Sequence, residues 1–205
     1  LVNGSAIGYY GADAGTGPFG SGLVEDLEPG DDFLAEVVAD WEAEARRAEA
    51  AGIRVAMLRT GVVLSPAGGM LQQVLPLFLA GLGGPVATSG GESHDGSPWL
   101  SWIGADDIAG AFAHAVLDDG VTGPLNAVAP EPVTAKEFAT VLGRVLRRPA
   151  LIPVPEAGPR LLLGEEGRAE TVAADQKVVA DRLVASGYEM RDPELEGALR
   201  HVLGR

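Results

Sequence analysis

The residue types that most often carry chemistry in proteins are either missing from this chain or widely spaced. The sequence contains no cysteine, which excludes disulfides, thiolate nucleophiles and thiolate metal sites. The histidines His94, His114 and His201 are too dispersed in the sequence to suggest a metal site. Asp106 and Asp107 are adjacent, but such a pair is more typical of a helix cap than of a metal ligand set. We therefore predict no metal centre.

One segment has the letters of a phosphate-binding loop. Gly15, Gly17 and Gly20 fit the pattern G-x-G-x-x-G, in which glycines let the backbone approach a dinucleotide phosphate. That pattern needs a strand before it and a helix after it. No strand has room before Gly15, and Pro18 stands where the helix should open. We interpret this segment as a loop insertion.

Charge and hydropathy exclude two classes of partner. The 205 residues carry 15 basic and 29 acidic side chains, a formal net charge of −14, which repels the phosphates of nucleic acids. No apolar run reaches the roughly 18 residues that a spanning helix needs, and the residues after Leu1 have no signal-peptide pattern. We expect no membrane partner and a cytoplasmic location. Residues 1–45 hold acids and no base, which we interpret as a solvated acidic face.

The elements that must position a site alternate between strand and helix. Strand patterns occupy residues 1–5, 53–58, 99–103 and 125–129, and helical patterns occupy residues 32–51, 70–80 and 108–117. This alternation predicts an α/β layer structure with a parallel sheet.

The first of these helices has clear boundaries in the sequence. Asp31 or Asp32 is its expected cap, and Gly52 is expected to end it. Its apolar residues recur at helical spacing and predict one face packed against the sheet. They are Phe33, Leu34, Val37, Val38, Trp41 and Ala45.

After Pro130 the pattern becomes mainly helical. Thr134 and Glu137 form a capping box for a helix that reaches about Arg147. Further helices are predicted over residues 159–164, 175–186 and 193–203.

Several segments resemble one known family, in order along the chain. They are Gly4–Gly11, Asp32–Val37, Leu58–Leu64, Gly81–Pro85, Trp99–Ile103 with Asp106 and Asp107, and Asn126–Thr134. Together they resemble the epimerase-family branch of the extended short-chain dehydrogenase/reductases, and the tail resembles the C-terminal domain of unknown function of those proteins. The resemblance covers essentially the whole chain.

This resemblance implies a fold and a domain division. Residues 1–129 would be the C-terminal part of a doubly wound, Rossmann-type parallel sheet, and residues 130–205 a small, mainly helical C-terminal lobe on the substrate side. The glycine-rich turn that holds the cofactor pyrophosphate in that fold has no counterpart before Leu1. We expect it to belong to an N-terminal half of about three βαβ units that this chain lacks.

The resemblance also implies candidate catalytic residues. Ser5 occupies the position of the family's strand-end serine, whose hydroxyl would hydrogen-bond a substrate oxygen; the alternative is a serine that satisfies local backbone. The family's Tyr-x-x-x-Lys pair is absent, because Phe33 and Val37 stand in its place. A phenyl ring cannot exchange a proton, so the usual acid/base mechanism is not available. Tyr9 and Tyr10 remain as candidate proton donors, with aromatic packing as the alternative.

The turn after the buried strand at residues 53–58 is the candidate cofactor site. Arg59, Thr60, Gly61 and Val62 occupy the position where such folds run past the nicotinamide. Backbone groups of Gly61 and Val62 would hold its carboxamide, and the glycine would let the ring approach. The alternative is a plain strand–loop junction. For Trp99 and Trp102, elsewhere in the chain, a place in the substrate cleft and a place in the core are both open.

Two function hypotheses follow. The first is an NAD(P)-dependent epimerase- or reductase-like protein whose small-molecule substrate is a nucleotide sugar or a carbonyl compound. Either NAD or NADP would serve as cofactor, with NADP slightly preferred. The alternative is a non-catalytic NAD(P)-binding regulatory or structural protein, which Phe33 and Val37 favour. We also expect the strand at Leu1–Ser5 to be an exposed edge through which the chain self-associates.

Overall fold

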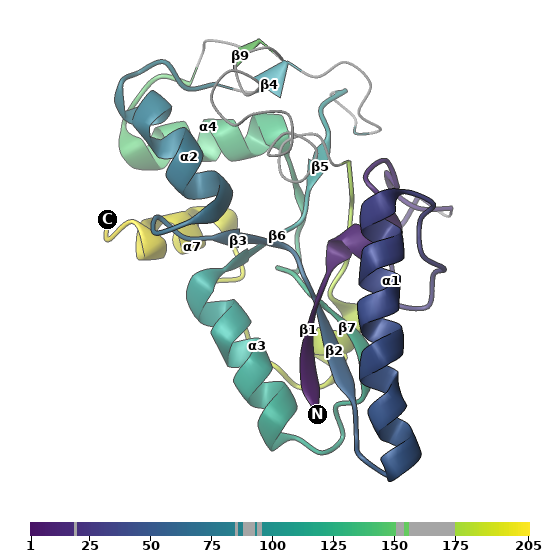
Figure 1. Cartoon of the computed structure of the whole chain (residues 1–205). Helices are drawn as coiled ribbons and strands as arrows, with labels where there is room; N and C mark the ends of the chain where they lie inside the picture. Colours follow the sequence, from purple (N-terminus) through teal and green to yellow (C-terminus); the bar gives the residue numbers. More distant parts are fainter. Residues whose placement is uncertain (19, 85, 88–92, 94–95, 151–153, 156–174) are drawn as a thin grey trace.

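A parallel sheet covered by helices on both faces forms one part of the molecule, and a second group of helices lies beside it (Figure 1). The structure is a computed structural model. It describes residues 1–18, 20–84, 86–87, 93, 96–150, 154–155 and 175–205. The arrangement confirms the predicted α/β class.

Three parallel strands make the central sheet in the order β1 (Val2–Ala6), β2 (Ala56–Thr60), β7 (Gly123–Ala127). The strands end in register, since Ala6 pairs with Thr60 and Thr60 with Ala127. β2 lies between the other two and is almost entirely buried, as expected of a parallel strand covered on both faces. It begins three residues later than predicted, and Ile53, within the predicted range, is 47% exposed. β1 is the edge strand of this described sheet, as predicted.

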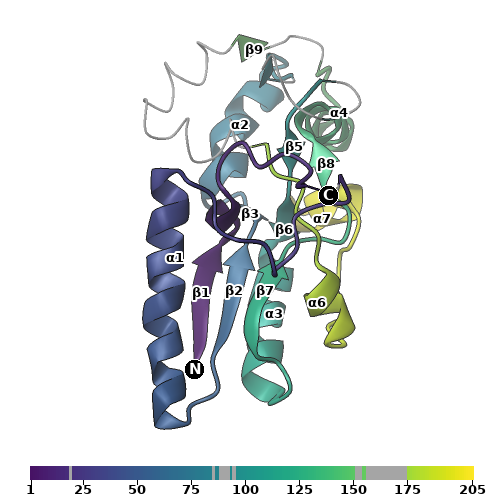
Figure 2. The same ribbon diagram turned by 90° about the vertical axis from the view of Figure 1, so that its right-hand side faces the viewer.

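Two helices cover opposite faces of the sheet (Figures 1 and 2). They are α1 (Phe33–Arg46) and α3 (Ala105–Leu117). Asp32 caps α1, since its Oδ1 accepts a hydrogen bond from the backbone N–H of Ala35 at 2.9 Å. A 3-10 turn, η2 (Arg47–Ala51), continues the helix to Gly52, whose φ of 74° ends it. Both predicted boundaries of this helix are therefore confirmed.

The buried face of α1 differs from the predicted one. Phe33 is 75% exposed and Trp41 is 55% exposed, so the expectation that they pack against the sheet was wrong. The buried residues are Ala35, Val38, Glu42 and Ala45. Small side chains let the helix approach the sheet closely, and Glu42 turns inward because Arg59 of β2 pairs with it.

Three pairs of short strands extend the fold. β3 (Val62–Leu64) pairs in parallel with β6 (Trp102–Gly104), and β4 (Val86–Ala87) pairs in parallel with β9 (Val154–Pro155). β5 (Trp99–Leu100) pairs antiparallel with β8 (Val133–Thr134). The single strand predicted over residues 99–103 is thus two strands. Ser101 separates them, and its side chain bonds to the backbone of another segment.

The second group of helices packs around its own apolar cluster. It contains α2 (Gly69–Leu79), α4 (Ala135–Leu146) and α7 (Leu195–Val202). Trp102 is a buried member of this cluster, so it lies in the core and does not line the pocket. The predicted capping box of α4 is confirmed: Thr134 Oγ1 accepts from Glu137 N at 3.1 Å, and Glu137 Oε2 accepts from Thr134 N at 2.7 Å.

The C-terminal segment is less helical than predicted. Only α6 (Asp181–Ala185) forms within residues 175–186, because the residues before it run beside the glycine-rich loop, with bridges Gly15–Gln176 and Leu23–Val178. Val178, Ala180 and Leu183 then join the apolar cluster of the central sheet. The helix predicted over residues 159–164 lies outside the described residues. Among the helices described, none combines the length and apolar character needed to cross a membrane.

Candidate functional site

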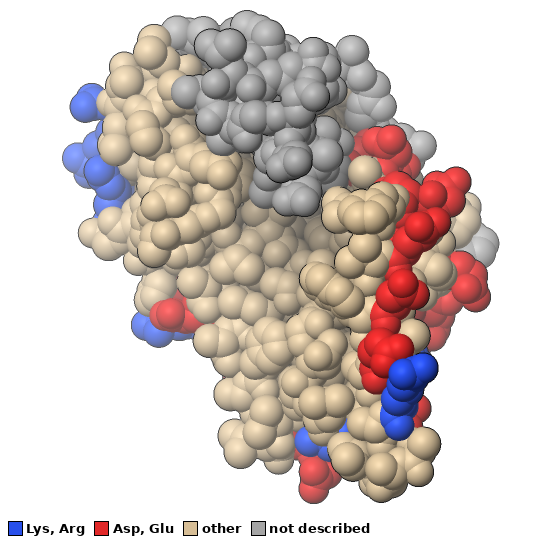
Figure 3. All heavy atoms as spheres, viewed as in Figure 1, with Lys and Arg blue, Asp and Glu red and all other residues tan. Residues whose placement is uncertain are grey.

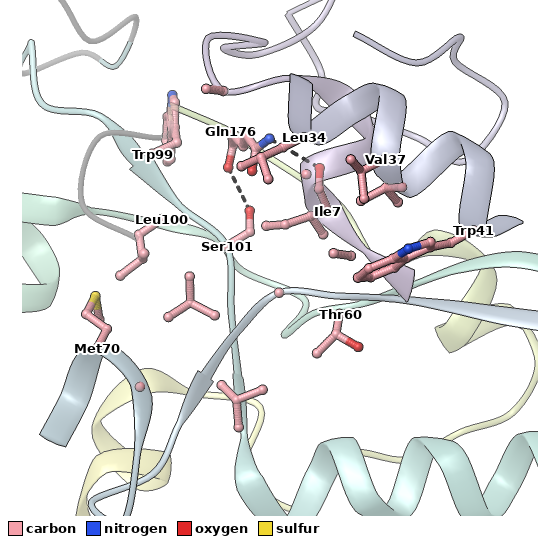
Figure 4. A pocket seen from close by; sticks show the side chains of 18 residues that line it. Ile7, Leu34, Val37, Trp41, Thr60, Met70, Trp99, Leu100, Ser101 and Gln176 are labelled. Carbon is pink, nitrogen blue, oxygen red and sulfur yellow. Dashed lines mark hydrogen bonds between the residues drawn. The ribbon is translucent and has the colours of Figure 1, made fainter. Parts of the chain in front are cut away.

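A pocket of about 450 Å³ opens at the carboxyl ends of β1 and β2 (Figure 4). Ala6 and Thr60, the last residues of the two strands, line it together with the turn at Gly61 and Val62. One side of α1 forms a wall through Leu34, Val37 and Trp41. These three apolar residues of α1 therefore face this pocket, whereas Phe33 lies outside its lining. Ligands of parallel α/β sheets bind in crevices at this edge.

The described lining of the pocket is mostly apolar and has no charged side chain. None of the 18 residues drawn in Figure 4 is acidic, basic, a histidine or a tyrosine. Its side-chain hydroxyls and amide belong to Thr60, Ser101 and Gln176. Trp99 also lines this pocket. The part of the lining that the structure describes therefore has no side chain that titrates near neutral pH.

Ser101 and Gln176 use their polar groups to hold the pocket wall together. The Gln176 amide donates to the carbonyl oxygens of Ile7 at 3.2 Å and Gly11 at 2.6 Å. The Ser101 hydroxyl donates to the Gln176 carbonyl at 2.8 Å and accepts from the backbone N–H of Val178 at 2.8 Å. These bonds tie the C-terminal segment to η1 (Ile7–Tyr10), the 3-10 turn after β1.

The predicted turn reaches the pocket only in part. Thr60, Gly61 and Val62 line it, whereas Arg59 is 1% exposed and points away. The N–H groups of Gly61 and Val62 already donate to backbone carbonyls, at 3.1 and 2.9 Å. A Cβ on Gly61 would lie 2.7 Å from a methyl of Val128 and 2.8 Å from the Ser101 carbonyl oxygen. The packing of this chain is therefore itself a reason for glycine here.

A buried ion pair joins α1 to the sheet behind the pocket. Ser5 and Asn126 flank Arg59 in register on β1 and β7. The Arg59 guanidinium donates two hydrogen bonds to the Glu42 carboxylate of α1, at 2.7 Å to Oε1 and 2.9 Å to Oε2. The Ser5 hydroxyl donates to the same Oε1 at 2.7 Å. Charge-assisted contacts of this two-pronged kind are strong and directional.

The two candidate tyrosines pack against this ion pair. The Arg59 guanidinium carbon lies 3.4 Å from the ring centroid of Tyr9. The Tyr10 hydroxyl donates to Asn126 Oδ1 at 2.7 Å and accepts from Arg59 Nη1 at 3.1 Å. Burial raises the pKa of Tyr10 to about 12, against the opposing effect of Arg59. Ser5, Tyr9 and Tyr10 are outside the described pocket lining.

The two buried carboxyl groups of this region have pKa values displaced in opposite directions. Burial raises the pKa of Glu25, although its Oε1 accepts the backbone N–H of Asn126 at 2.9 Å. Burial acts the same way on Glu42, but the hydrogen bonds and charge of Arg59, with the Ser5 hydroxyl, outweigh it and lower that pKa. Glu42 is therefore the ionised partner of Arg59.

Sequence reasoning missed Glu25, Glu42 and Asn126. A signal was present for Glu42, because Arg59 is a charge at the end of an apolar strand pattern and a buried charge needs a partner. Glu42 also shares helical spacing with Val38 and Ala45. For Glu25 and Asn126 the sequence holds no comparable signal.

The remaining polar candidates have structural partners. His114 contacts the Ser186 hydroxyl at 2.9 Å, and His201 contacts Asp106 at 2.9 Å; His94 lies outside the described residues. Gly104, not an aspartate, is the N-cap of α3. Asp107 instead accepts the backbone N–H of Arg191 at 2.7 Å, because the C-terminal segment crosses there.

Comparison with known proteins identifies relatives over the whole chain. Residues 154–202 match a family described as a domain of unknown function, DUF1731. The chain is 35% identical over 205 residues to the epimerase family protein Mb2239 of Mycobacterium bovis, covering all of this chain and 64% of that protein. It is 42% identical over 181 residues to the epimerase family protein SDR39U1 of Bos taurus, covering 87% of this chain and 58% of that one.

Two crystal structures share both fold and sequence with it. Human epimerase family protein SDR39U1 (isoform 2) with NADPH superposes with a TM-score of 0.79 at 34% identity, over 99% of this chain and 64% of that one. A nucleoside-diphosphate sugar epimerase of Corynebacterium glutamicum superposes with a TM-score of 0.72 at 36% identity, over 99% of this chain and 37% of that one. The chain spans less than two thirds of the length of these proteins. By sequence and by fold, the chain is similar to epimerase family proteins over nearly its whole length, and its C-terminal part matches DUF1731.

Proposed function

We propose that this chain forms the nicotinamide side and the substrate side of an NAD(P)-dependent epimerase- or reductase-like protein. The observation that carries the proposal is the apolar pocket at the carboxyl ends of β1 and β2, with Thr60–Val62 at its edge. The human relative that superposes on the chain has NADPH in its structure, which favours NADP over NAD.

The residues of the pocket suit a nicotinamide ring. The ring is flat and carries one carboxamide, and Ile7, Val37 and Val62 offer it apolar contacts. The Thr60 hydroxyl donates to the Leu58 carbonyl at 3.2 Å, so its oxygen can still accept a hydrogen bond from the carboxamide. The described lining has no lysine or arginine to bind phosphate. These residues therefore suit only the nicotinamide end of the cofactor. When bound, the cofactor would supply or accept a hydride.

The residues behind the pocket would position it. Arg59 is the residue before Thr60, and its bonds to Glu42 and Tyr10 hold the end of β2. We assign Ser5, Tyr9 and Tyr10 the same positioning role, because their contacts converge on this ion pair. A direct bond from Ser5 to a substrate oxygen remains the alternative.

The non-catalytic NAD(P)-binding protein is a second candidate function. It is favoured by the absence of a titratable side chain from the described pocket lining. Among the described lining residues, proton transfer would need a hydroxyl or a water molecule. The two candidates share the cofactor site and differ only in turnover.

Filling the pocket from α1 tests cofactor binding. Val37→Trp in the full-length protein should weaken NADPH binding, measured by nicotinamide fluorescence, by at least about tenfold, because the indole would occupy the ring's space. Phe33→Trp is the matched control, since Phe33 is 75% exposed on the same helix and lies outside the lining. Unchanged NADPH affinity in Val37→Trp would refute the site. Turnover with a panel of sugars and carbonyl compounds then separates enzyme from binding protein.

A further inference from the structure

The pocket has two ends that different elements build. The end described above lies at β1, β2 and α1. The other, the distal end, is lined by Val63, Met70, Trp99, Leu100 and Ser101, from β3, α2, β5 and the residue that follows β5. Figure 4 shows Met70, Leu100 and Trp99 on one side of Ser101, and Val37 and Trp41 on the other. A substrate beside the nicotinamide would extend into this distal end.

The described lining of the distal end is mainly hydrocarbon; its polar side-chain groups are the Ser101 hydroxyl and the indole N–H of Trp99, which is buried and has no hydrogen-bond partner among the described residues. Its hydroxyl, on Ser101, already donates to the Gln176 carbonyl and accepts from the Val178 N–H, both at 2.8 Å. The Nε2 group of the neighbouring Gln176 already donates to the carbonyl oxygens of Ile7 and Gly11. Breaking these bonds to serve a ligand would loosen the wall of the pocket itself.

Charge is also missing from the described lining of this end. The nearby Lys177 is not a lining residue, and its ammonium lies 4.9 Å from the centroid of the Trp99 ring, in a cation–π contact. A diphosphate group placed among Val63, Met70 and Leu100 would be desolvated without a counter-charge. An apolar ligand group placed there would instead gain from leaving water.

A sugar ring is poorly matched to such a surface. It carries several hydroxyls, and each one buried without a partner loses a hydrogen bond to water that the protein does not replace. An aliphatic or aromatic ring of the same size loses none. The difference in hydrogen bonding therefore favours an aliphatic or aromatic ring over a sugar ring.

We infer that the distal end binds an uncharged carbonyl compound with apolar substituents, and not the sugar of a nucleotide sugar. The inference rests on the proposed function, of which it names the substrate class. It concerns binding by this chain's own residues, so it can be tested without turnover.

Ligand-observed NMR on the full-length protein with NADPH tests it, using 4-tert-butylcyclohexanone and UDP-glucose as probes. We expect the ketone to bind at least about tenfold more tightly than UDP-glucose. Leu100→Gln should weaken ketone binding about tenfold, because it puts an amide into the apolar surface. Leu79→Gln is the matched control on α2, since Leu79 is 46% exposed and outside the lining.

Three results would overturn the inference: tighter binding of UDP-glucose, no binding of the ketone, or a ketone affinity unaffected by Leu100→Gln. Repeating both titrations without NADPH separates this outcome from that of the proposed function. Failure to bind NADPH would refute the proposed function, while the preference between the two probes would still decide the substrate class.

Discussion

At the scale of single residues, the buried pair of Arg59 and Glu42 is the feature on which the pocket depends. It joins the end of β2 to α1, and Ser5 and Asn126 extend it across the sheet. A buried ion pair adds little stability compared with an apolar pair, but losing one partner leaves an uncompensated charge. The pair therefore determines how α1 is turned.

Removing the arginine should be costly. Arg59→Met leaves the Glu42 carboxylate buried without its partner, and we expect the free energy of unfolding to fall by about 3–5 kcal/mol in urea titrations. Arg46→Met is the control, because Arg46 contacts Glu42 at 3.6 Å from a side chain that is 46% exposed. The control should lose about 0–1 kcal/mol. Equal losses in the two variants would contradict the assigned role of Arg59.

Ser5→Ala separates the two roles of this serine. The hydroxyl donates to a buried, ionised carboxylate, so its removal should lower the free energy of unfolding by about 1.5–3 kcal/mol. Thermal or urea unfolding measures this directly. Unchanged stability together with lost substrate binding would instead assign the hydroxyl to the substrate.

Glu25 makes stability depend on pH. Its pKa is raised in the folded state, so as pH rises above the ordinary glutamate range the unfolded chain releases this proton before the folded chain does. Stability is lost over that window. Glu25→Gln cannot titrate, so its stability relative to the wild type should be greater at about pH 7 than at about pH 4. Glu36→Gln, on the exposed side of α1, is the control. An equal gain in the free energy of unfolding at both pH values in Glu25→Gln would contradict the raised pKa of Glu25.

At the scale of elements, α1 has one side against the sheet, one side facing the pocket and one side exposed to solvent. Small residues and Glu42 face the sheet, and Leu34, Val37 and Trp41 face the pocket. Glu36, Asp40 and Glu44 are exposed, and acidic side chains gather along this helix in Figure 3. The amphipathic pattern of the helix thus combines a core face and a ligand face, which differ in side-chain size.

Two substitutions in α1 distinguish these faces. Ala35 is fully buried, so Ala35→Leu should overpack the contact with the sheet and cost about 1–3 kcal/mol. Trp41→Ala should cost less than about 1 kcal/mol, because its side chain is 55% exposed, and should weaken binding in the pocket. Urea unfolding compares them, and a larger loss for Trp41→Ala would restore the face predicted from sequence.

At the scale of the whole molecule, the sheet has an open edge in the described chain. β1 pairs with β2 on one side only, so backbone groups on its other side have no ladder partner within the sheet. Unprotected edges recruit other strands. The position of β1 in the strand order therefore favours association of the 205-residue chain.

Sedimentation velocity over a range of concentrations tests this. We expect the 205-residue chain to self-associate, and Asn3→Lys, which places a charge on the edge, to weaken association. Thr140→Lys makes the same charge change on the exposed side of α4 and should leave association unchanged. A monomer at every concentration would refute self-association through β1.

The sequence by itself determined the features that have local causes. The Asp32 cap, the stop at Gly52 and the capping box at Thr134 and Glu137 each need only a few neighbouring residues. The α/β class follows from the order of strand and helix patterns. The turn at Thr60–Val62 was located by resemblance, and the pocket opens beside it.

Only the tertiary structure decided which residues meet across the chain. Gln176 bonds to Ile7, 169 positions away, and Asn126 bonds to Tyr10, 116 positions away. The rotation of α1 follows the pairing of Glu42 with Arg59, because a buried charge must reach its partner while an exposed tryptophan can line a pocket. Hydrophobic periodicity shows that a helix has an apolar side; partners brought together by folding decide what that side faces.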